Sequence, residues 1–438
     1  MIKTEDLPRE YDWVKLDNFL FNKALDEVIN GDENIHFQSP AGCGKSLIIK
    51  IVSAMKKNVV VLSTTGTTAI QLSTEGIPAK TIHSFFQLPP LPVIPEENIN
   101  KFVGTNKAVL DAAEMIIIDE VSMLNSHIFD VIIKKMVEFR KHHDIPRLIL
   151  FGDVLQLPPV VENNGIVGDF FKKNYNGNIM FFNSNSYKNL NFKMMTLSQS
   201  YRQVDTEFAE KMLNIGINSY DNSTLDYFNS RVMSLSKYEE THKKYIYMAT
   251  TNATVNKVNN DYIKNLYATE WKVFKADKSP KFPDGLIEDE ILIKNNAQVM
   301  ATRNNYDEGY SNGMIGTVID FDDDGVAIET ETGKIVKIGK SRYEIMEPFV
   351  DGGEIIYRKK AWATQLDCKI CRACTCHKSQ GKTFDNAYFA IQGWTPPGIV
   401  YVGLSRLTSL NGLGLSRKIT SQDVKIFQEA MDFLTKDV

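Results

Sequence analysis

The 438-residue sequence predicts an α/β protein with two parallel-sheet domains, the first carrying a short insertion and the second a small β-rich one. Between residues 34 and 160, apolar strand-like runs alternate with amphipathic helical stretches, which is typical of a parallel sheet covered on both faces. A second set of this kind begins near residue 180. Because the chain is too long for one compact core, we expect a first domain over 1–179 and a second over 180–438.

The first domain is expected to have four inner strands and one insertion. The strands are predicted at 35–38, 59–62, 115–118 and 147–151. Four prolines fall between Leu88 and Pro95. Proline cannot continue a helix or an inner strand, so residues 88–106 are predicted to be an extruded loop or small inserted element.

The second domain is expected to contain a small antiparallel barrel at residues 297–357. Short β-rich runs occur there, separated by turns such as Asp323-Asp324-Gly325. Around it, strands are predicted at 245–250, 369–376 and 387–391, and helices at 255–266 and 422–434, the last capped by Thr420 or Ser421.

The composition excludes several classes of protein. Apolar residues make up 43% and charged residues 24%, as in ordinary globular proteins. Residues 1–6 lack the apolar segment of a secretion signal and no apolar run could span a bilayer, so we expect an intracellular protein without membrane association. A net charge of −4 argues against a broad basic surface for nucleic acid, but not against a groove lined by hydroxyls and amides.

The most informative stretch is the loop after the first strand, Ser39-Pro40-Ala41-Gly42-Cys43-Gly44-Lys45-Ser46. Gly42 and Gly44 allow backbone N–H groups to close around phosphates, and the helix that follows directs its positive end at them. Lys45 is expected to reach the β- and γ-phosphates, and the Ser46 hydroxyl to ligate Mg²⁺. The stretch therefore predicts a site for a nucleoside triphosphate, although its first position is serine instead of the usual glycine.

Two acids and one amide follow inner strands of the same predicted sheet. Ligands lie at the carboxyl ends of strands in open α/β sheets, so Asp119 and Glu120 should lie beside the phosphate loop. Asp119 is expected to hold Mg²⁺, and Glu120 to orient and deprotonate the attacking water. Gln156 is placed to bring an amide to the γ-phosphate, and the prolines after it form a rigid segment for another ligand.

Ten stretches, taken in order, resemble the Pif-type DNA helicases of the RecD-like branch of superfamily one. They are 39–46, 64–69, 81–86, 119–124, 152–160, 201–203, 250–253, 312–316, 377–381 and 401–406. The resemblance implies two RecA-like domains with ATP in the cleft between them. It also implies that 88–106 forms a wedge that parts the duplex and that 297–357 forms an SH3-like barrel.

The resemblance assigns roles to the residues at matching positions. Arg202 and Arg406 are implied to be arginine fingers, which suits a planar guanidinium that stabilises charge on the γ-phosphate. The implied nucleotide contacts further include Gln380, Gly381 and, near adenine, Asn22. The positions that touch single-stranded DNA in the family are Thr64, Gly66, Thr81, His83, Pro159, Asn252, His377 and Ser379. For the two histidines, a satisfied core position is the alternative.

The implied activity is that of an ATP- and Mg²⁺-dependent DNA helicase, acting as a monomer on single-stranded DNA and at single-strand/duplex junctions. Movement is expected to be 5′→3′, because superfamily-one helicases of the opposite polarity carry large helical insertions in both domains. One alternative is an ATP-driven translocase that unwinds poorly. Another is an ATP-sensing DNA-binding module without catalysis, against which Glu120 and the two arginines argue.

Four of the five cysteines lie within residues 368–376. Their C-x₂-C-x₂-C-x-C spacing is compatible with zinc or an iron–sulfur cluster. A buried strand is the favoured interpretation, because Cys374 and Cys376 are two apart and would share one face, with Cys371 on the other. We therefore expect no bound metal there.

Overall fold

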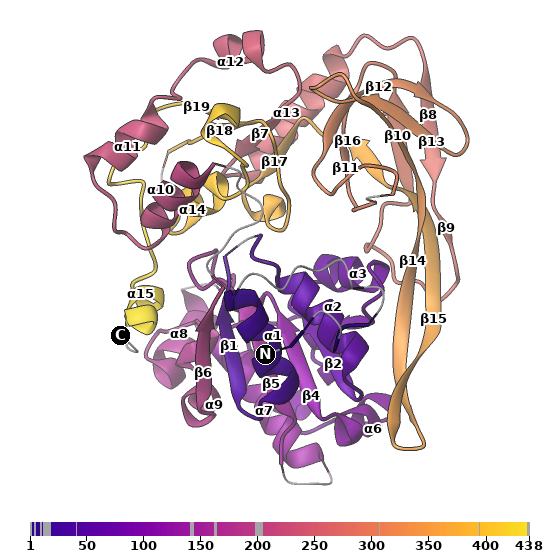
Figure 1. The fold of residues 1–438 in the computed structure, drawn as a ribbon, viewed down its shortest axis with the longest axis vertical. Helices are drawn as coiled ribbons and strands as arrows, with labels where there is room; N and C mark the ends of the chain where they lie inside the picture. Colours follow the sequence, from indigo (N-terminus) through magenta and orange to yellow (C-terminus); the bar gives the residue numbers. More distant parts are fainter. Residues whose placement is uncertain are drawn as a thin grey trace.

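The computed structural model describes residues 2–3, 6–8, 11, 19–40, 42–140, 144–161, 164–197, 205–305, 307–393 and 395–435. Figure 1 shows the N-terminal part as a lower lobe, with the later α/β part above it and a β-rich element along one side. Within the described ranges, no helix is both long and apolar enough to cross a membrane.

The lower lobe is built on a six-stranded parallel sheet with the order β3-β2-β4-β5-β1-β6. Its strands are β1 (Asn34–Gln38), β2 (Val59–Ser63), β3 (Ala79–Thr81), β4 (Met115–Asp119), β5 (Arg147–Gly152) and β6 (Phe192–Thr196). The four strands predicted from sequence are confirmed. Because all strands run the same way, their carboxyl ends meet at one edge of the sheet.

Helices cover both faces of this sheet, which explains why its inner strands β2 and β4 are buried along their whole length. They are α1 (Phe19–Asn30), α2 (Lys45–Met55), α3 (Gly66–Thr74), α4 (Ile82–Phe86), α5 (Glu96–Ile99), α6 (Thr105–Ala112), α7 (Ser126–Phe139), α8 (Gly165–Tyr175) and α9 (Asn185–Asn189). Successive side chains of a strand point to opposite faces. In β4, Ile117 accordingly packs in the core beneath α1 and α2, whereas Ile116 and Ile118 pack in the core beneath α4, α6 and α7.

The proline-rich segment 88–106 is packed against the lobe, so the expectation of an extruded loop is wrong in part. Leu88, Ile94 and Phe102 are buried in the core with α7. The Lys135 ammonium donates to the carbonyl of Lys101 over 2.6 Å. Apolar side chains between the prolines thus attach the insertion to the domain.

The first domain extends beyond the expected boundary at 179/180. β6 pairs in parallel with β1, from Asn34↔Phe192 to Gln38↔Thr196. Phe181, Phe182 and Tyr187 lie in the same core as β4. The first domain therefore ends later than expected, because strand pairing across the sheet, and not sequence order, decides to which domain an edge strand belongs.

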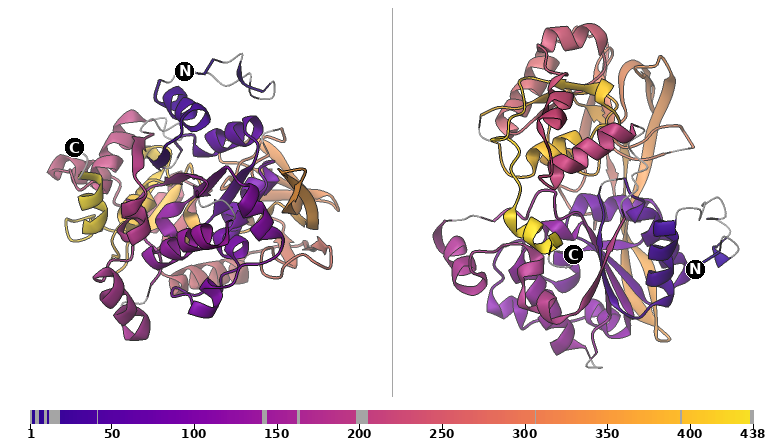
Figure 2. Two further views of the ribbon diagram at one scale, coloured as in Figure 1. Left: turned by 90° about the horizontal axis from the view of Figure 1, so that it is seen from below. Right: turned by 60° about the vertical axis from the view of Figure 1, so that its left-hand side comes forward.

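The C-terminal helix returns to the first domain, beside the lower lobe in Figures 1 and 2. It is shorter than the expected 422–434 and spans Gln428–Thr435 (α15). It does not start at Thr420, because the Asp423 carboxylate accepts hydrogen bonds from the Thr420 amide and hydroxyl in a turn. In α15, Phe433 stacks on Phe182 with 4.3 Å between ring centroids.

His36 of β1 makes the stability of this region sensitive to pH. Burial lowers the pKa of His36 to about 3, its Nδ1 lies 2.7 Å from the Tyr187 hydroxyl, and its ring stacks on Phe433. Because the pKa of His36 is lower in the folded than in the unfolded protein, the residue stabilises the fold at pH values above its unfolded-state pKa of about 6.5. This stabilisation is lost as the pH falls from that value toward the folded-state pKa. We expect the free energy of unfolding to drop by about 1.4 kcal/mol per pH unit from this residue between about pH 6 and pH 4.

Urea unfolding of the parent and of His36→Gln at several pH values measures this contribution. Glutamine does not titrate. The free energy of unfolding of the variant should therefore fall less steeply with decreasing pH than that of the parent, by the contribution of one titrating group. Equal slopes for the two proteins would contradict the assignment.

The second α/β domain is a four-stranded parallel sheet with the order β17-β7-β18-β19. Its strands are β7 (Ile246–Ala249), β17 (Ala373–Thr375), β18 (Ala387–Ala390) and β19 (Leu413–Leu415). Its helices are α10 (Thr206–Gly216), α11 (Asn222–Asn229), α12 (Leu235–Thr241), α13 (Asn252–Asn265) and α14 (Ile399–Leu404). The predicted strands near 245–250 and 387–391, and the helix near 255–266, are confirmed.

An antiparallel β-rich element is inserted into this domain, as expected, but it is larger than 297–357. A seven-stranded sheet has the order β16-β11-β12-β13-β14-β15-β9, and β10 and β8 form a two-stranded sheet beside it. The strands are β8 (Trp271–Lys275), β9 (Asp277–Lys278), β10 (Glu290–Lys294), β11 (Gln298–Ala301), β12 (Ile315–Phe321), β13 (Gly325–Glu329), β14 (Ile335–Asp351), β15 (Glu354–Leu366) and β16 (Cys368–Ile370). The flanking strands belong to it because Phe274, Ile293 and Cys368 share one apolar core. The hairpin β14–β15 reaches the first domain, where Tyr357 donates to the carbonyl of Val59 over 3.1 Å.

The cysteine-rich segment is divided between two sheets, in place of the single strand expected at 369–376. Cys368 pairs with Ala301 in the inserted sheet, whereas Cys371, Cys374 and Cys376 all lie in the core of the second α/β domain. The expectation that Cys371 faces away from the other two is therefore wrong, because the chain turns between β16 and β17. Burial raises the pKa of all four thiols, and among the described residues no three metal-ligating side chains come together.

Candidate active site and nucleic-acid interface

The phosphate loop lies between β1 and α2 at the carboxyl edge of the first sheet. Gly42 and Gly44 both have a φ of 83°, a left-handed conformation that glycine adopts without strain. Helix α2 starts at Lys45, and no described side chain caps its N-terminus. The first N–H groups of such a helix have no partner within it and carry partial positive charge. The loop is therefore built to receive an anionic phosphate.

Within the phosphate loop, Cys43 faces the core and Ser46 faces the solvent. Cys43 is buried in the core beneath α1 and α2, which anchors the loop from below. Ser46 is exposed on the first turn of α2. Its hydroxyl and the Asp119 carboxylate at the end of β4 are oxygen ligands of the kind that Mg²⁺ prefers. These residues fit a magnesium–nucleotide complex at this edge.

Lys45 lies among carboxylates, which keep it charged. Its Nζ is 3.3 Å from Oε1 of Glu120. Burial by itself lowers the pKa of Lys45, but the charges of Glu120, Asp119 and Asp153 outweigh it and raise that pKa. The ammonium group is therefore available as a cation for phosphate oxygens.

The two acids after β4 have different environments. Burial, and then the charge of Glu120, raises the pKa of Asp119 to about 6, while its Oδ1 accepts a hydrogen bond from the Glu120 amide. Glu120 has a φ of 55°, which is unusual for a residue other than glycine. The Thr64 hydroxyl donates to the Glu120 carbonyl over 3.1 Å. Such backbone strain is typical of functional sites.

Gln156 belongs to a buried network centred on Asp153. Oδ1 of Asp153 accepts from Gln38 Nε2 at 2.7 Å, and Oδ2 accepts from Gln156 Nε2 at 3.2 Å. Gln380 of the second domain donates to Oε1 of Gln156 over 3.5 Å, so the network joins the two domains. Tyr401 also donates to Asp153, and no role for Gln38, Asp153 or Tyr401 was expected from the sequence. The last two lie inside family stretches, which was the available signal.

Arg406 approaches this cluster from the second domain. Its guanidinium is fully buried and donates to three neutral acceptors, the carbonyls of Val402 and Ser379 and the Ser405 hydroxyl. Burial lowers the pKa of Arg406, and the nearby charge of Glu120 opposes that shift. Its positive charge thus lies opposite the carboxylates of the first domain. Arg202, the other expected finger, lies outside the described residues.

The expected DNA contacts of the first domain follow the ends of β2 and β3. Thr64 and Gly66 come directly after β2, and Thr81 ends β3 and caps α4, which contains His83. Burial lowers the pKa of His83, which favours its neutral form. A Cβ on Gly66 would come 3.2 Å from the side chain of Leu286, so the loop between β9 and β10 lies against the start of α3.

The remaining expected contacts differ in accessibility. Asn252 at the start of α13 and His377 are exposed. Pro159 and Ser379 are buried, and the Ser379 hydroxyl donates to the carbonyl of Cys376 over 2.7 Å. Those two side chains are not presented to a ligand in this arrangement.

The expected nucleotide contacts are spread over both domains. Asn22 is buried in α1, Gln380 is hydrogen-bonded to Gln156 of the first domain, and Gly381 is exposed with a φ of 77°. The structure therefore brings Gln380 to the candidate active site and leaves Asn22 within the packed first domain.

The profile of the PIF1-like helicases matches residues 17–226. The ATP-dependent DNA helicase Pif1 of Campylobacter jejuni is 29% identical, and the alignment covers 90% of both chains. The chain is similar to the Pif1-like helicases over most of its length. The ATP-dependent DNA helicase Pif1 of Bdellovibrio bacteriovorus is 26% identical over 90% of this chain and 86% of its own.

Solved structures of Pif1 from a Bacteroides species share the architecture of this Pif1-like chain. The complex with ADP-AlF4 has a TM-score of 0.86 at 26% identity, covering 96% of this chain and 97% of that one. The structure bound to single-stranded DNA has a TM-score of 0.64 at 27% identity, covering 96% of both chains. The two RecA-like parallel-sheet domains and the small β-rich insertion are thus those of Pif1 structures, as the sequence predicted.

Proposed function

We propose that this Pif1-like helicase hydrolyses ATP with Mg²⁺ in the cleft between its α/β domains and moves 5′→3′ along single-stranded DNA as a monomer, opening duplexes at single-strand/duplex junctions. One observation carries this proposal: Glu120 of the first domain lies 3.3 Å from the Lys45 ammonium and close enough to the buried Arg406 of the second domain for their charges to interact. A site completed by both domains can convert nucleotide turnover into relative movement of the domains.

Each residue of the cleft has a chemical task in this proposal. The N–H groups of the phosphate loop and the Lys45 ammonium bind and orient the phosphates. Glu120 accepts the proton of the attacking water, and the Arg406 guanidinium stabilises charge on the transferred group. When bound by Ser46 and Asp119, Mg²⁺ would supply further neutralisation of the phosphate charge.

The hydrogen bond from Thr64 to Glu120 supports coupling between DNA and ATP. Thr64 is an expected DNA contact, and its hydroxyl holds the peptide of the candidate base. A DNA phosphate that competes for this hydroxyl would change the constraint on Glu120. Such a link gives a physical route for DNA to stimulate hydrolysis.

The arrangement of domains here is more similar to DNA-free Pif1. The TM-score is 0.85 with unliganded Bacteroides Pif1 and 0.64 with the DNA-bound form, at 27% identity in both cases. We infer that DNA binding in this protein rearranges its parts and moves Leu286 of the inserted element away from Gly66.

An ATP-driven translocase that unwinds weakly is the second candidate. It is favoured by the packing of residues 88–106, because a wedge attached through Leu88, Ile94 and Phe102 projects less than an extruded loop would. Exposed Leu91 and Val103 are the large apolar side chains that this segment presents to solvent.

A pair of matched duplexes tests polarity and unwinding together. With ATP and Mg²⁺, we expect strand separation of the duplex with a 5′ single-stranded tail and no separation of the matched duplex with a 3′ tail. Hydrolysis stimulated by single-stranded DNA without separation of either tailed duplex would favour the translocase. Separation of the 3′-tailed duplex alone would refute the proposed direction.

A further inference from the structure

A buried hydrogen bond crosses from the second domain to the first beside the candidate ATP site. The Tyr401 hydroxyl of α14 donates to Oδ2 of Asp153 over 2.8 Å. Tyr401 is 2% exposed and Asp153 is fully buried. Hydrogen bonds between a neutral donor and a buried carboxylate are among the stronger ones in proteins, so this contact constrains both partners.

The acceptor is a rigid part of the first domain. Besides Tyr401, the Asp153 carboxylate accepts from the side chains of Gln38 and Gln156 and from the amide of Leu155. These three donors hold it at the end of β5, beside the glutamine expected at the γ-phosphate. The tyrosine hydroxyl is thus the contribution of the other domain to a carboxylate that is already oriented.

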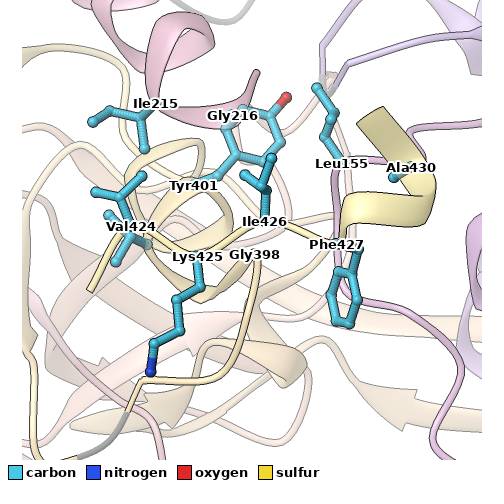
Figure 3. Close-up of a pocket in the computed structure, with 11 residues that line it drawn as sticks. Leu155, Ile215, Gly216, Gly398, Tyr401, Val424, Lys425, Ile426, Phe427 and Ala430 are labelled. Carbon is cyan, nitrogen blue, oxygen red and sulfur yellow. The ribbon is translucent and has the colours of Figure 1, made fainter. Parts of the chain in front are cut away.

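The donor is equally constrained on its own side. Figure 3 shows Tyr401 lining a small pocket with Leu155, Gly216 and Phe427. A Cβ at Gly216 would come 2.8 Å from the Tyr401 ring, so the ring packs directly on the end of α10. A Cβ at Gly398, the N-cap of α14, would lie 3.3 Å from the Leu155 carbonyl, so the start of α14 approaches the Asp153–Gln156 loop closely.

Arg406 lies two residues beyond the end of the same short helix, α14 (Ile399–Leu404). Its Nε donates to the carbonyl of Val402 at 3.1 Å, and its Nη2 to the Ser405 hydroxyl at 2.7 Å. These bonds fix the guanidinium to the C-terminal end of α14. Any shift of α14 relative to Asp153 therefore moves Arg406 relative to Glu120.

We propose that Tyr401 is a positioning residue which, through its hydroxyl on Asp153, sets the approach of Arg406 to the ATP site and keeps it in register with Gln156. The proposal rests on the proposed role of Arg406 in hydrolysis. Tyr401 itself contacts neither nucleotide nor DNA in this scheme. Removing its hydroxyl loosens α14 against the first domain without changing any group that binds substrate.

The test is Tyr401→Phe in the full chain, which removes one oxygen atom and keeps the ring. DNA-stimulated kcat is expected to fall by roughly 10- to 100-fold, the value of a hydrogen bond to a charged group. KM for ATP and Kd for a single-stranded oligonucleotide should stay within about twofold, because the substitution removes no group that binds ATP or DNA in this proposal. Tyr238→Phe is the matched control, since the Tyr238 hydroxyl is also buried but donates within its own domain, to the Gly412 carbonyl over 2.6 Å.

Combining Tyr401→Phe with Arg406→Ala distinguishes this proposal from the proposed function. If Tyr401 acts through Arg406, it should have little further effect on single-turnover hydrolysis once Arg406 is gone. Equal losses from Tyr401→Phe in both backgrounds, an unchanged kcat, or the same profile as Tyr238→Phe would overturn the proposal. If Arg406→Ala alone left turnover intact, the proposed use of Arg406 would fail first.

Discussion

Replacing Arg406 with alanine is expected to lower DNA-stimulated ATP turnover by roughly a thousandfold, the scale of effect of an arginine finger. The guanidinium is fully buried, and its acceptors within the chain are neutral. Because these acceptors carry no negative charge, they do not neutralise the guanidinium, whose charge can act on the phosphate. Steady-state hydrolysis measures the loss, and a fluorescent ATP analogue should still bind with nearly unchanged affinity.

Arg417→Ala is the matched control for this prediction. Arg417 lies in the same domain and makes two hydrogen bonds of 2.7 Å to the Asp423 carboxylate. Loss of these hydrogen bonds should lower the free energy of unfolding and leave kcat for ATP unchanged. Arg406→Lys keeps a charge without the planar guanidinium, so we expect it to restore little activity. A structural role would be indicated if Arg406→Ala unfolded the protein or abolished nucleotide binding.

Replacing Lys45 with alanine is expected to abolish ATP turnover, a loss of at least about a hundredfold to a thousandfold for one electrostatic group. The substitution removes the ammonium group that lies 3.3 Å from Glu120. The repulsion between the charges of Asp119 and Glu120 is then less compensated. The phosphate loop then keeps its N–H groups but loses its point charge. Binding of a labelled single-stranded oligonucleotide should be preserved, because the expected DNA contacts lie elsewhere.

Lys50→Ala provides a control on the same helix. Lys50 pairs with Glu75 at 2.8 Å instead of with Asp119 or Glu120. This variant should retain turnover and differ mainly in stability. Near-normal hydrolysis by Lys45→Ala would remove the basis for assigning the phosphate loop.

Features that depend on a few neighbouring residues were determined by the sequence alone. The phosphate loop needs glycines with positive φ followed by a lysine at a helix start, and Gly42, Gly44 and Lys45 meet these conditions locally. The inner strands of the first sheet are buried on both faces, so they form continuous apolar runs that predict their own position. The acids at the end of β4 follow from the same reasoning, because strand ends and ligands share one edge of the sheet.

Features that depend on pairing between distant segments were decided only by the tertiary structure. β6 joins β1 across more than 150 residues, and α15 leaves the second domain to pack on Phe182 of the first. The side chains of β6 are only half-buried, so the apolar pattern that marked the inner strands is absent there. The hydrogen bond from Tyr401 to Asp153 joins residues 248 positions apart, and neither residue has a local pattern that predicts its partner. Local sequence determines conformation, whereas the partner of an edge strand or a buried hydroxyl is set by which surfaces the whole chain can bury together.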